Sequence, residues 1–303
     1  MIKTVSIVGK GALGLLFGDL IARNKGIECI EYVMDDARYE RHKGEAVTVS
    51  GKPCQIPTVR ASEARTPDLI IVATKATGLD AAIETIKGFA GPDTHFLSLL
   101  NGISSEEKLA REFGWDRLPL CVAQGMDAVF MEGALTYSHA GELRVGAAED
   151  TSSAALASII SFLEESGIPC IFEDDMRRRL WTKYMMNVGV NQTCMAYGGT
   201  YGSVSAEGEQ NRMFVAAMRE VLAVANAEGV HLTEADLAAM SDLAASLDPN
   251  GLPSMAQDRI NRKPSEVDEF SGALIALAEK HGILVPANRY LNKRIHEIES
   301  EYV

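Results

Sequence analysis

Apolar and polar positions are arranged differently in the two parts of this chain. Up to about residue 172, short apolar or β-branched runs such as 4–8 and 69–73 are each followed by a helical pattern. A continuous apolar run of this kind is typical of a strand buried on both faces of a parallel sheet. From residue 173 onward nearly every segment has helical spacing. The pattern predicts an α/β fold with a doubly wound sheet in residues 1–172 and an all-helical domain in residues 173–303.

The same patterns predict individual elements of the first part. Strands are expected at 4–8, 28–34, 69–73, 95–100 and 169–172, and helices at 15–23, 80–89 and 153–166. Residues 47–49 and 55–59 are interpreted as a small hairpin, and residues 119–147 as antiparallel strands that finish the sheet. Ser104 and Glu107 have the spacing of a capping box at the start of another helix.

A glycine-rich motif stands between the first strand and the first helix. It reads Gly9, Lys10, Gly11, Ala12, Leu13, Gly14. In this position a G-x-G-x-x-G motif indicates a Rossmann-type dinucleotide site. The first glycine allows a tight turn, the second lets a pyrophosphate approach the backbone, and the third lets the helix pack on the strand. The free N–H groups of the helix then face the anion.

Three further candidates follow at the carboxyl ends of the next strands, where open α/β sheets bind ligands. They are Asp35, Lys75 and Asn101. An acidic residue at about the position of Asp35 usually binds the ribose hydroxyls of NAD and disfavours the extra phosphate of NADP. Arg38 and Arg41 follow closely and could pair with such a phosphate, so the choice of cofactor stays open.

The segment 180–191, LWTKYMMNVGVN, carries a polar stripe on a helix that is otherwise apolar. Lys183, Asn187 and Asn191 are spaced four residues apart and therefore lie on one face of a helix. Burying a lysine and two carboxamides is costly unless each finds a partner. Two interpretations follow: a hydrogen-bonded set between helices, or a ladder facing a ligand, in which Lys183 donates a proton or hydrogen bond and the asparagines orient a small polar molecule.

The rest of the second part predicts helices at 206–228, 233–247 and 264–281, and a last helix after Pro286. Ser254 and Gln257 again have capping-box spacing, so Ser254 is expected to cap a helix, although a capped helix N-terminus also suits a carboxylate ligand. Glu266 falls in the first turn of a predicted helix, where an acidic residue ordinarily complements the helix dipole.

Composition excludes several classes of function. The 303 residues carry a net charge of -13 and no large basic cluster, which argues against nucleic acid and anionic membranes as partners. Five scattered cysteines without a C-x-x-C motif, and no H-E-x-x-H motif, predict no metal site. No apolar run is long enough to span a membrane and no signal peptide is evident, so we expect a cytoplasmic protein.

Six motifs occur in a defined order: GKGALG at 9–14, TK at 74–75, NG at 101–102, LWTKYMMNVGVN at 180–191, PSMAQD at 253–258 and SEVDEFSG at 265–272. In this order they resemble the ketopantoate reductase (2-dehydropantoate 2-reductase) family over essentially the whole chain. The glycine motif is shared by many dehydrogenases. The S-M-x-Q-D and E-[IV]-D-x-x-x-G pair behind the lysine helix is more specific.

The resemblance implies reduction of the 2-keto group of ketopantoate to pantoate by hydride transfer from NADPH, a step of pantothenate and coenzyme A biosynthesis. It places the cofactor on the N-terminal domain, with Lys75 and Asn101 near the nicotinamide, and the substrate in a cleft between the domains. Lys183 matches the catalytic lysine that protonates the keto oxygen, and Glu266 the glutamate that binds the substrate hydroxyl. Ser254 and Asn191 match substrate-contacting positions, Asn187 lies between, and Asn101 is a candidate for substrate contact as well.

Two departures from the family pattern keep alternatives open. Met34, Asp35 and Asp36 stand where a basic residue often binds the phosphate of NADP, and Gly251 stands where the family has an asparagine, with Asn250 one position away. An NADH-dependent D-2-hydroxyacid dehydrogenase on the same fold is therefore the second hypothesis, favoured by Asp35 and disfavoured by Glu266.

A non-catalytic dinucleotide sensor is the third hypothesis, and it would predict that Lys183 is lost or moved. For both enzyme hypotheses the partner is a small 2-keto acid. A homodimer is compatible with the sequence, which does not determine the oligomeric state.

Overall fold

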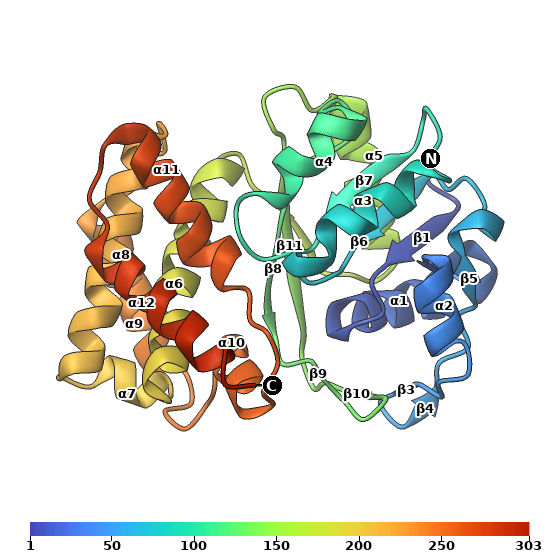
Figure 1. Ribbon diagram of the computed structural model, residues 1–303. Helices are drawn as coiled ribbons and strands as arrows, with labels where there is room; N and C mark the ends of the chain where they lie inside the picture. Colours follow the sequence, from blue (N-terminus) through green and yellow to red (C-terminus); the bar gives the residue numbers. More distant parts are fainter. Residues whose placement is uncertain (303) are drawn as a thin grey trace. The chain divides into compact units, whose positions relative to one another are not determined.

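The computed structural model of the protein describes residues 1–302, and the chain divides into two compact units. Unit 1 comprises Met1–Asn101 and Ser105–Met176. Unit 2 comprises Gly102–Ser104 and the chain from Arg177 onward. Figure 1 colours the chain along the sequence, from blue at the N-terminus to red at the C-terminus. The chain therefore contributes to unit 2 twice, first with a short loop and then with the whole helical part.

Unit 1 is built on a parallel sheet with the strand order β5-β2-β1-β6-β7. Its strands are β1 (Val5–Val8), β2 (Ile30–Met34), β5 (Thr58–Arg60), β6 (Leu69–Val72) and β7 (His95–Ser98). All residues of β1 and β6 are buried, as the continuous apolar runs predict. The strand order changes direction beside β1, and open α/β sheets bind ligands at such a point.

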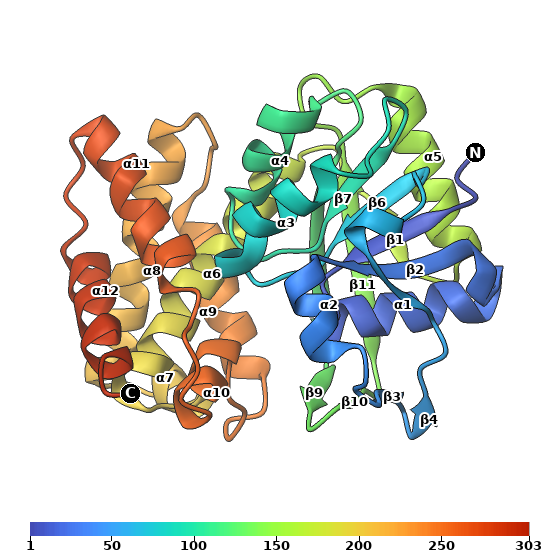
Figure 2. The same cartoon turned by 45° about the vertical axis from the view of Figure 1, so that its right-hand side comes forward.

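Helices cover both faces of this sheet. Successive strand residues point to opposite faces, so Ile7 packs in one core with Phe17 and Val8 packs in another with Ile83. The first core includes α1 (Ala12–Lys25) and α5 (Ser153–Glu165), and the second includes α3 (Leu79–Lys87) and α4 (Ser105–Phe113). Figure 2 shows these helices around the strands. The doubly wound, Rossmann-type sheet predicted from the sequence is confirmed.

Short elements complete the connections of unit 1. They are α2 (Asp36–His42) and the single-turn helices η1 (Ile27–Cys29), η2 (Ala61–Glu63) and η3 (Ala76–Gly78). The expected strand at 28–34 is shorter than predicted, because its first residues form η1.

The segment 119–147 does form antiparallel strands, but they do not finish the main sheet. Strands β8 (Leu120–Met126) and β11 (Ala140–Gly146) pair with β12 (Cys170–Phe172) in a separate sheet of three strands. Strands β9 (Val129–Met131) and β10 (Ala134–Thr136) join a further small sheet with β3 (Thr48–Val49) and β4 (Lys52–Pro53). The expectation of one continuous sheet was therefore wrong.

The predicted hairpin between 47–49 and 55–59 was wrong in its second strand. Strand β3 (Thr48–Val49) pairs with β4 (Lys52–Pro53) across Ser50 and Gly51, whose φ angles are 48° and 78°. Two positive φ angles in a two-residue loop favour the tightest hairpin turn. Because β3 pairs with β4 across this turn, β5 (Thr58–Arg60) is not part of the hairpin and joins the main sheet beside β2.

Unit 2 is helical, as predicted. Its helices are α6 (Met176–Tyr197), α7 (Tyr201–Ser205), α8 (Glu209–Ala227), α9 (Glu234–Ser246), α10 (Ser254–Ile260), the π-helix η4 (Asp268–Gly272), α11 (Ala273–His281) and α12 (Pro286–Glu299). The expected helix at 206–228 is α8, and the short α7 lies before it. Within residues 1–302, no helix is both long and apolar enough to cross a membrane, and no three His, Cys, Asp or Glu side chains are grouped to hold a metal ion.

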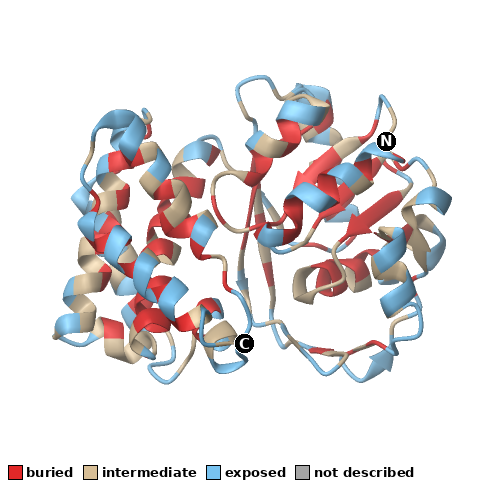
Figure 3. Cartoon of the chain, in the orientation of Figure 1, coloured by how far each residue is buried: buried red, intermediate tan, exposed pale blue. Residues whose placement is uncertain are grey.

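One apolar core fills unit 2, and α6 contributes to it along most of its length. Met185, Val188 and Met195 on α6 are buried with Phe214 of α8 and Leu274 of α11. Figure 3 shows buried residues along the length of α6 and along the helices packed around it. The prediction of a core-like helix over 180–191 is confirmed, and the polar residues of that helix therefore lie within or at the margin of this core.

We predict that Gly18→Ala destabilises unit 1. A Cβ at this position of α1 would lie 2.3 Å from the hydroxyl oxygen of the buried Tyr32, so the gain in helix propensity is outweighed by about 1–3 kcal/mol of overpacking. Urea unfolding measures the loss. Gly44→Ala is the control, because a Cβ there meets no atom within 4 Å. Adding Tyr32→Phe should recover part of the loss, and purely additive losses would contradict the overpacking explanation.

Candidate functional site

The glycine loop between β1 and α1 has the shape that an anion site requires. A Cβ at Gly9, where φ is 116°, would lie 2.4 Å from the carbonyl carbon of Ala73. A Cβ at Gly14 would lie 1.9 Å from the carbonyl oxygen of Gly9, so only glycine lets α1 begin so close to the loop.

Gly11 differs from the other two glycines. It is the N-cap residue of α1, provides no side-chain cap, and has open space where a Cβ would be. The N–H groups of the first helical residues, Ala12 and Leu13, are at the positive end of the helix dipole. A pyrophosphate therefore fits at this loop, and Gly9, Lys10, Gly11, Ala12, Leu13 and Gly14 are the residues that would hold it.

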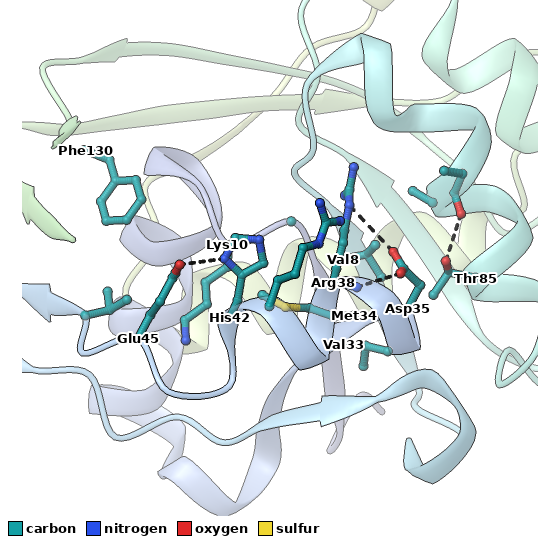
Figure 4. Close-up of a pocket in the computed structure, with 15 residues that line it drawn as sticks. Val8, Lys10, Val33, Met34, Asp35, Arg38, His42, Glu45, Thr85 and Phe130 are labelled. Atoms are coloured by element: carbon teal, nitrogen blue, oxygen red, sulfur yellow. Dashed lines mark hydrogen bonds and ion pairs between the residues drawn. The ribbon is translucent and has the colours of Figure 1, made fainter. Parts of the chain in front are cut away.

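A cavity of about 420 Å³ lies beside the loop, within unit 1. Its polar lining comes from Lys10, Asp35, Arg38, Arg41, His42, Glu45 and Thr85, and Figure 4 shows most of these side chains. Asp35 caps α2, because its Oδ1 accepts a hydrogen bond of 2.9 Å from the backbone N–H of Arg38. Its Oδ2 lies 3.6 Å from Nε of the same arginine. Asp35 is thus partly engaged before any ligand arrives.

The other charged groups of this cavity also have defined partners. Nζ of Lys10 donates to Oγ1 of Thr58 at 3.0 Å and lies 5.4 Å from the centre of the Tyr32 ring. Nδ1 of His42 and Oε1 of Glu45 are 2.8 Å apart. Lys10, Arg38 and Arg41 supply three permanent positive charges against the two carboxylates of Asp35 and Glu45. The cavity therefore suits the adenosine part of a dinucleotide, and its charge favours an anion.

Lys75 and Asn101 lie where the sequence predicts, after neighbouring strands of the main sheet. Lys75 is exposed and stands at the N-cap position of the single-turn helix η3, which follows β6. Its carbonyl oxygen accepts a 2.9 Å hydrogen bond from the N–H of Gly78. Asn101 is half-buried and follows β7. Because β6 and β7 are adjacent and parallel, both residues lie at the same edge of the sheet as the glycine loop and Asp35.

Two of the three residues of the polar stripe on α6, Asn187 and Asn191, are joined by a hydrogen bond within unit 2. Lys183 and Asn187 are half-buried, and Asn191 is buried. Nδ2 of Asn191 donates to Oδ1 of Asn187 over a long 3.4 Å. Oδ1 of Asn191 accepts hydrogen bonds from Oγ of Ser254 at 2.9 Å and from the backbone N–H of Met255 at 3.2 Å. The hydrogen-bonded set therefore comprises Asn187, Asn191 and Ser254, and Lys183 lies on the same face of α6, one turn before Asn187.

The expectation that Ser254 caps α10 was wrong. Pro253 is the N-cap residue, Ser254 is the first helical residue, and its hydroxyl donates to Asn191. Gln257 does not complete a capping box, because its Nε2 donates to the carbonyl oxygen of Leu252. The acceptor for the start of α10 comes instead from Asn191, distant in the sequence, so Ser254 is held beside the stripe.

Glu266 lies directly before the helix rather than in its first turn, because the helix begins at Val267. Its carbonyl oxygen accepts from the N–H groups of Glu269 at 3.0 Å and Phe270 at 3.1 Å. The next residues form the π-helix η4, which the sequence pattern did not predict. π-Helical turns are rare and frequent at functional sites.

Asn250 is an exposed turn residue whose N–H donates to Oδ1 of Asp248 at 3.0 Å. A Cβ at the neighbouring Gly251 would lie 3.0 Å from Cδ2 of Tyr201. The Tyr201 ring thus occupies the space that a larger side chain at 251 would need.

Two contacts near Glu266 were missed. The Ser104 hydroxyl, predicted as a helix cap, donates to Oε2 of Glu269. The hydroxyl of Tyr184, adjacent to Lys183, donates to the carbonyl oxygen of Phe270 at 2.5 Å. Burial, together with the Glu269 carboxylate, raises the pKa of Tyr184 far above its ordinary value, which keeps its hydroxyl a donor. For the contact of Tyr184, the only indication in the sequence was a tyrosine at an apolar position of the helix.

Comparison with known proteins covers nearly the whole chain. The family model described as "Ketopantoate reductase PanE/ApbA" matches residues 5–149, and the model of its C-terminal part matches residues 175–299. The 2-dehydropantoate 2-reductase of Streptococcus pyogenes serotype M1 is 26% identical over 98% of both chains. These relatives are enzymes, so the hypothesis of a non-catalytic sensor is not retained.

Solved structures share the fold. The 2-dehydropantoate 2-reductase from Geobacter metallireducens is 25% identical with a TM-score of 0.84, covering 97% of this chain and 99% of that one. A D-mandelate dehydrogenase in complex with NADH and anilino(oxo)acetate is 24% identical with a TM-score of 0.87, covering 99% of both chains. At that identity the second likeness concerns the fold alone.

We predict that Asn191→Ala destabilises the protein by about 1–3 kcal/mol, because it removes the acceptor of two hydrogen bonds and leaves the buried N–H of Met255 without one. Urea unfolding followed by tryptophan fluorescence measures the loss. Asn187→Ala is the matched control, since Asn187 is half-buried and accepts only the long bond from Asn191. Equal losses for the two variants would show that Asn191 does not hold α10.

Proposed function

Because the chain belongs to the ketopantoate reductase family and is an NAD(P)-dependent oxidoreductase, we propose that it reduces the 2-keto group of ketopantoate to the D-hydroxy acid pantoate. The observation that carries this proposal is the polar stripe of α6, in which Lys183 shares a helix face with Asn187 and Asn191, while Asn191 accepts a hydrogen bond from Ser254 of α10. When bound, the dinucleotide supplies the hydride.

Lys183 is the proton donor in this proposal. As hydride reaches the keto carbon, negative charge develops on the keto oxygen, and an ammonium group aimed at that oxygen stabilises the charge and delivers the proton. The half-buried position of Lys183 on a helix packed in the core keeps its backbone fixed and leaves its ammonium end at the margin of the core. Asn187 provides its Nδ2 as a donor for the substrate carboxylate or keto oxygen, and Ser254 can donate to the substrate only by giving up its hydrogen bond to Asn191.

Glu266 is the acceptor for the substrate hydroxyl. A carboxylate can only accept hydrogen bonds when ionised, so it favours a substrate that carries a hydroxyl over one that carries a methyl group at the same place. Lys75 and Asn101 are proposed to contact the nicotinamide end of the cofactor, with Asn101 also available to the substrate. Their place at the carboxyl ends of β6 and β7 supports this role.

We predict that Lys183→Ala lowers kcat for ketopantoate by about a hundredfold or more, the usual contribution of a general acid. Initial rates of NADPH oxidation measure the effect, and dinucleotide binding measured by fluorescence should be unchanged. Turnover that survives the substitution would exclude Lys183 as the proton donor. Loss of both turnover and cofactor binding would instead indicate a folding defect. Lys183→Met, which has similar length and no charge, tests this: it should fold and bind the cofactor but lose turnover.

The cofactor is proposed to be NADPH. Arg38 and Arg41 line the cavity beside the glycine loop, and Arg38 keeps much of its side chain exposed while it contacts Asp35. The three cations of this cavity outnumber its carboxylates, and one oxygen of Asp35 is already committed to capping α2. The extra phosphate of NADPH, on the adenosine ribose, is therefore better accommodated here than the isolated motif Met34-Asp35-Asp36 suggests.

We predict that Arg38→Ala raises KM for NADPH about tenfold or more, the effect of losing one charge-assisted hydrogen bond, with little change for NADH. Asp35→Ser should lower KM for NADPH, because serine preserves the helix cap but removes the negative charge. Lys43→Ala is the control on the same segment, since Lys43 pairs with Glu40 and does not line the cavity. A wild type that prefers NADH would refute the assignment.

A D-2-hydroxyacid dehydrogenase that uses NADH is the second candidate. One observation favours it: the Tyr201 ring packs against Gly251, where the resemblance expects an asparagine, and Asn250 does not replace that side chain in the buried part of the unit. Rates with ketopantoate and with trimethylpyruvate, which has a methyl group in place of the hydroxymethyl group, distinguish the two candidates. Preference for trimethylpyruvate with NADH would support the second.

A further inference from the structure

The segment that follows Glu266 is wound as a π-helix and is held from outside by side chains of α6. Within η4 the carbonyl oxygen of Phe270 accepts the hydroxyl of Tyr184, and the N–H of the next residue, Ser271, donates to Oε1 of Gln192 at 3.2 Å. Tyr184 and Gln192 are two turns apart on α6, and both are buried. The Phe270–Ser271 peptide group of the π-helix is therefore held at both its C=O and its N–H by one neighbouring helix.

The orientation of the Gln192 carboxamide is determined by its other partners. Its Nε2 donates to the carbonyl oxygen of Val188 at 2.8 Å and to Oδ1 of Asn288 at 3.2 Å. Both amide hydrogens are thus used, and the oxygen is directed to Ser271. Nδ2 of Asn288 in turn donates to Oε2 of Glu220 at 2.8 Å, and an ionised carboxylate can only accept. The direction of every bond in this relay follows from Glu220.

The relay reaches the backbone next to Glu266. The Ser271 hydroxyl donates to the carbonyl oxygen of Val267 at 3.3 Å and accepts from Nδ2 of Asn292 at 3.1 Å. On the other side of Glu266, the N–H of the buried Ser265 donates to Oε1 of Glu299 at 2.8 Å. Glu266 is therefore held between two anchored neighbours, while its own carbonyl oxygen accepts from within η4.

We propose that Tyr184 and Gln192 are positioning residues for Glu266. By holding the Phe270–Ser271 peptide group at both ends they maintain the π-helical turn, and the turn sets where the Glu266 side chain begins. The inference rests on the proposed role of Glu266 as acceptor of the substrate hydroxyl. It assigns a function in substrate discrimination to two buried polar groups that touch no reacting atom.

The test uses Tyr184→Phe and Gln192→Met, which preserve volume and remove the hydrogen bonds. For each variant, kcat and KM are measured with ketopantoate and with trimethylpyruvate. The expected result is a rise of about tenfold or more in KM for ketopantoate with a much smaller change for trimethylpyruvate, which has no hydroxyl for Glu266 to bind. Glu266→Ala should show the same loss of discrimination.

Thr182→Val is the matched control. Thr182 also neighbours Lys183, but its hydroxyl donates within α6, to the carbonyl oxygen of Arg178 at 2.7 Å. We expect this variant to keep the wild-type ratio of kcat/KM for the two substrates. Equal losses for both substrates in the Tyr184 and Gln192 variants would overturn the positioning role and leave only a contribution to stability.

Crystal structures of the two variants separate this inference from the proposed function. Conversion of residues 268–272 to α-helical winding, with a displaced Glu266, supports the positioning role even if the wild type does not discriminate between the two substrates. A π-helix and a Glu266 that are unchanged in both variants would overturn it, whatever the substrate is. Absence of discrimination by the wild type would instead count against the role proposed for Glu266.

Discussion

The hydrogen bonds of the buried carboxamides on α6 are the constraint on which unit 2 depends. A carboxamide in an apolar core costs several kcal/mol unless its donors and acceptor are paired, so its partners must be supplied by other elements. Asn191 and Gln192 are consecutive residues and point about 100° apart around the helix. Asn191 therefore reaches the start of α10, and Gln192 reaches η4 and α12. Two adjacent side chains fix three neighbouring elements relative to the helix that carries Lys183.

Unit 1 meets a comparable demand with glycines instead of polar side chains. Its ligand is proposed to be an anion, and the backbone must approach it without side chains in the way. Gly9 and Gly14 are required by contacts with Ala73 and with each other, whereas Gly11 is bordered by open space. The first two glycines therefore have a packing role that any Rossmann-type unit shares, and only Gly11 has the free space that a ligand needs.

The sequence was sufficient for features that depend on periodicity or on a local motif. The main strands, helix α6 and the glycine loop follow from such patterns, because each is decided within a few turns of chain. Helix starts were also close, since α10 begins at Ser254 and α4 directly after Ser104. The predicted cap at Ser254 was wrong, and the groups to which both serine hydroxyls donate, Asn191 and Glu269, are remote in the sequence.

Tertiary placement explains the remaining differences in the same way. The π-helix could not be predicted, because its Phe270–Ser271 peptide group is held by Tyr184 and Gln192, which lie about 80 residues earlier in the chain. The second strand of the predicted hairpin was misassigned because a tighter turn at Ser50 and Gly51 closes first. Local spacing determines which elements form, and the acceptor that each polar side chain finds depends on elements that only the fold brings near.

In the proposed reaction, a fixed position of the Glu266 carboxylate matters more for substrate selection than a short distance to the substrate hydroxyl. A carboxylate discriminates against a methyl group only if it is left without a donor when the wrong substrate binds. If its backbone could shift, the carboxylate would turn to water or to another donor, and the penalty would disappear. Anchors at Ser265 and Ser271, with the relay that ends on Glu220, oppose such a shift from both sides. The buried amides of α6 thus connect the stability of unit 2 to the selection of substrate.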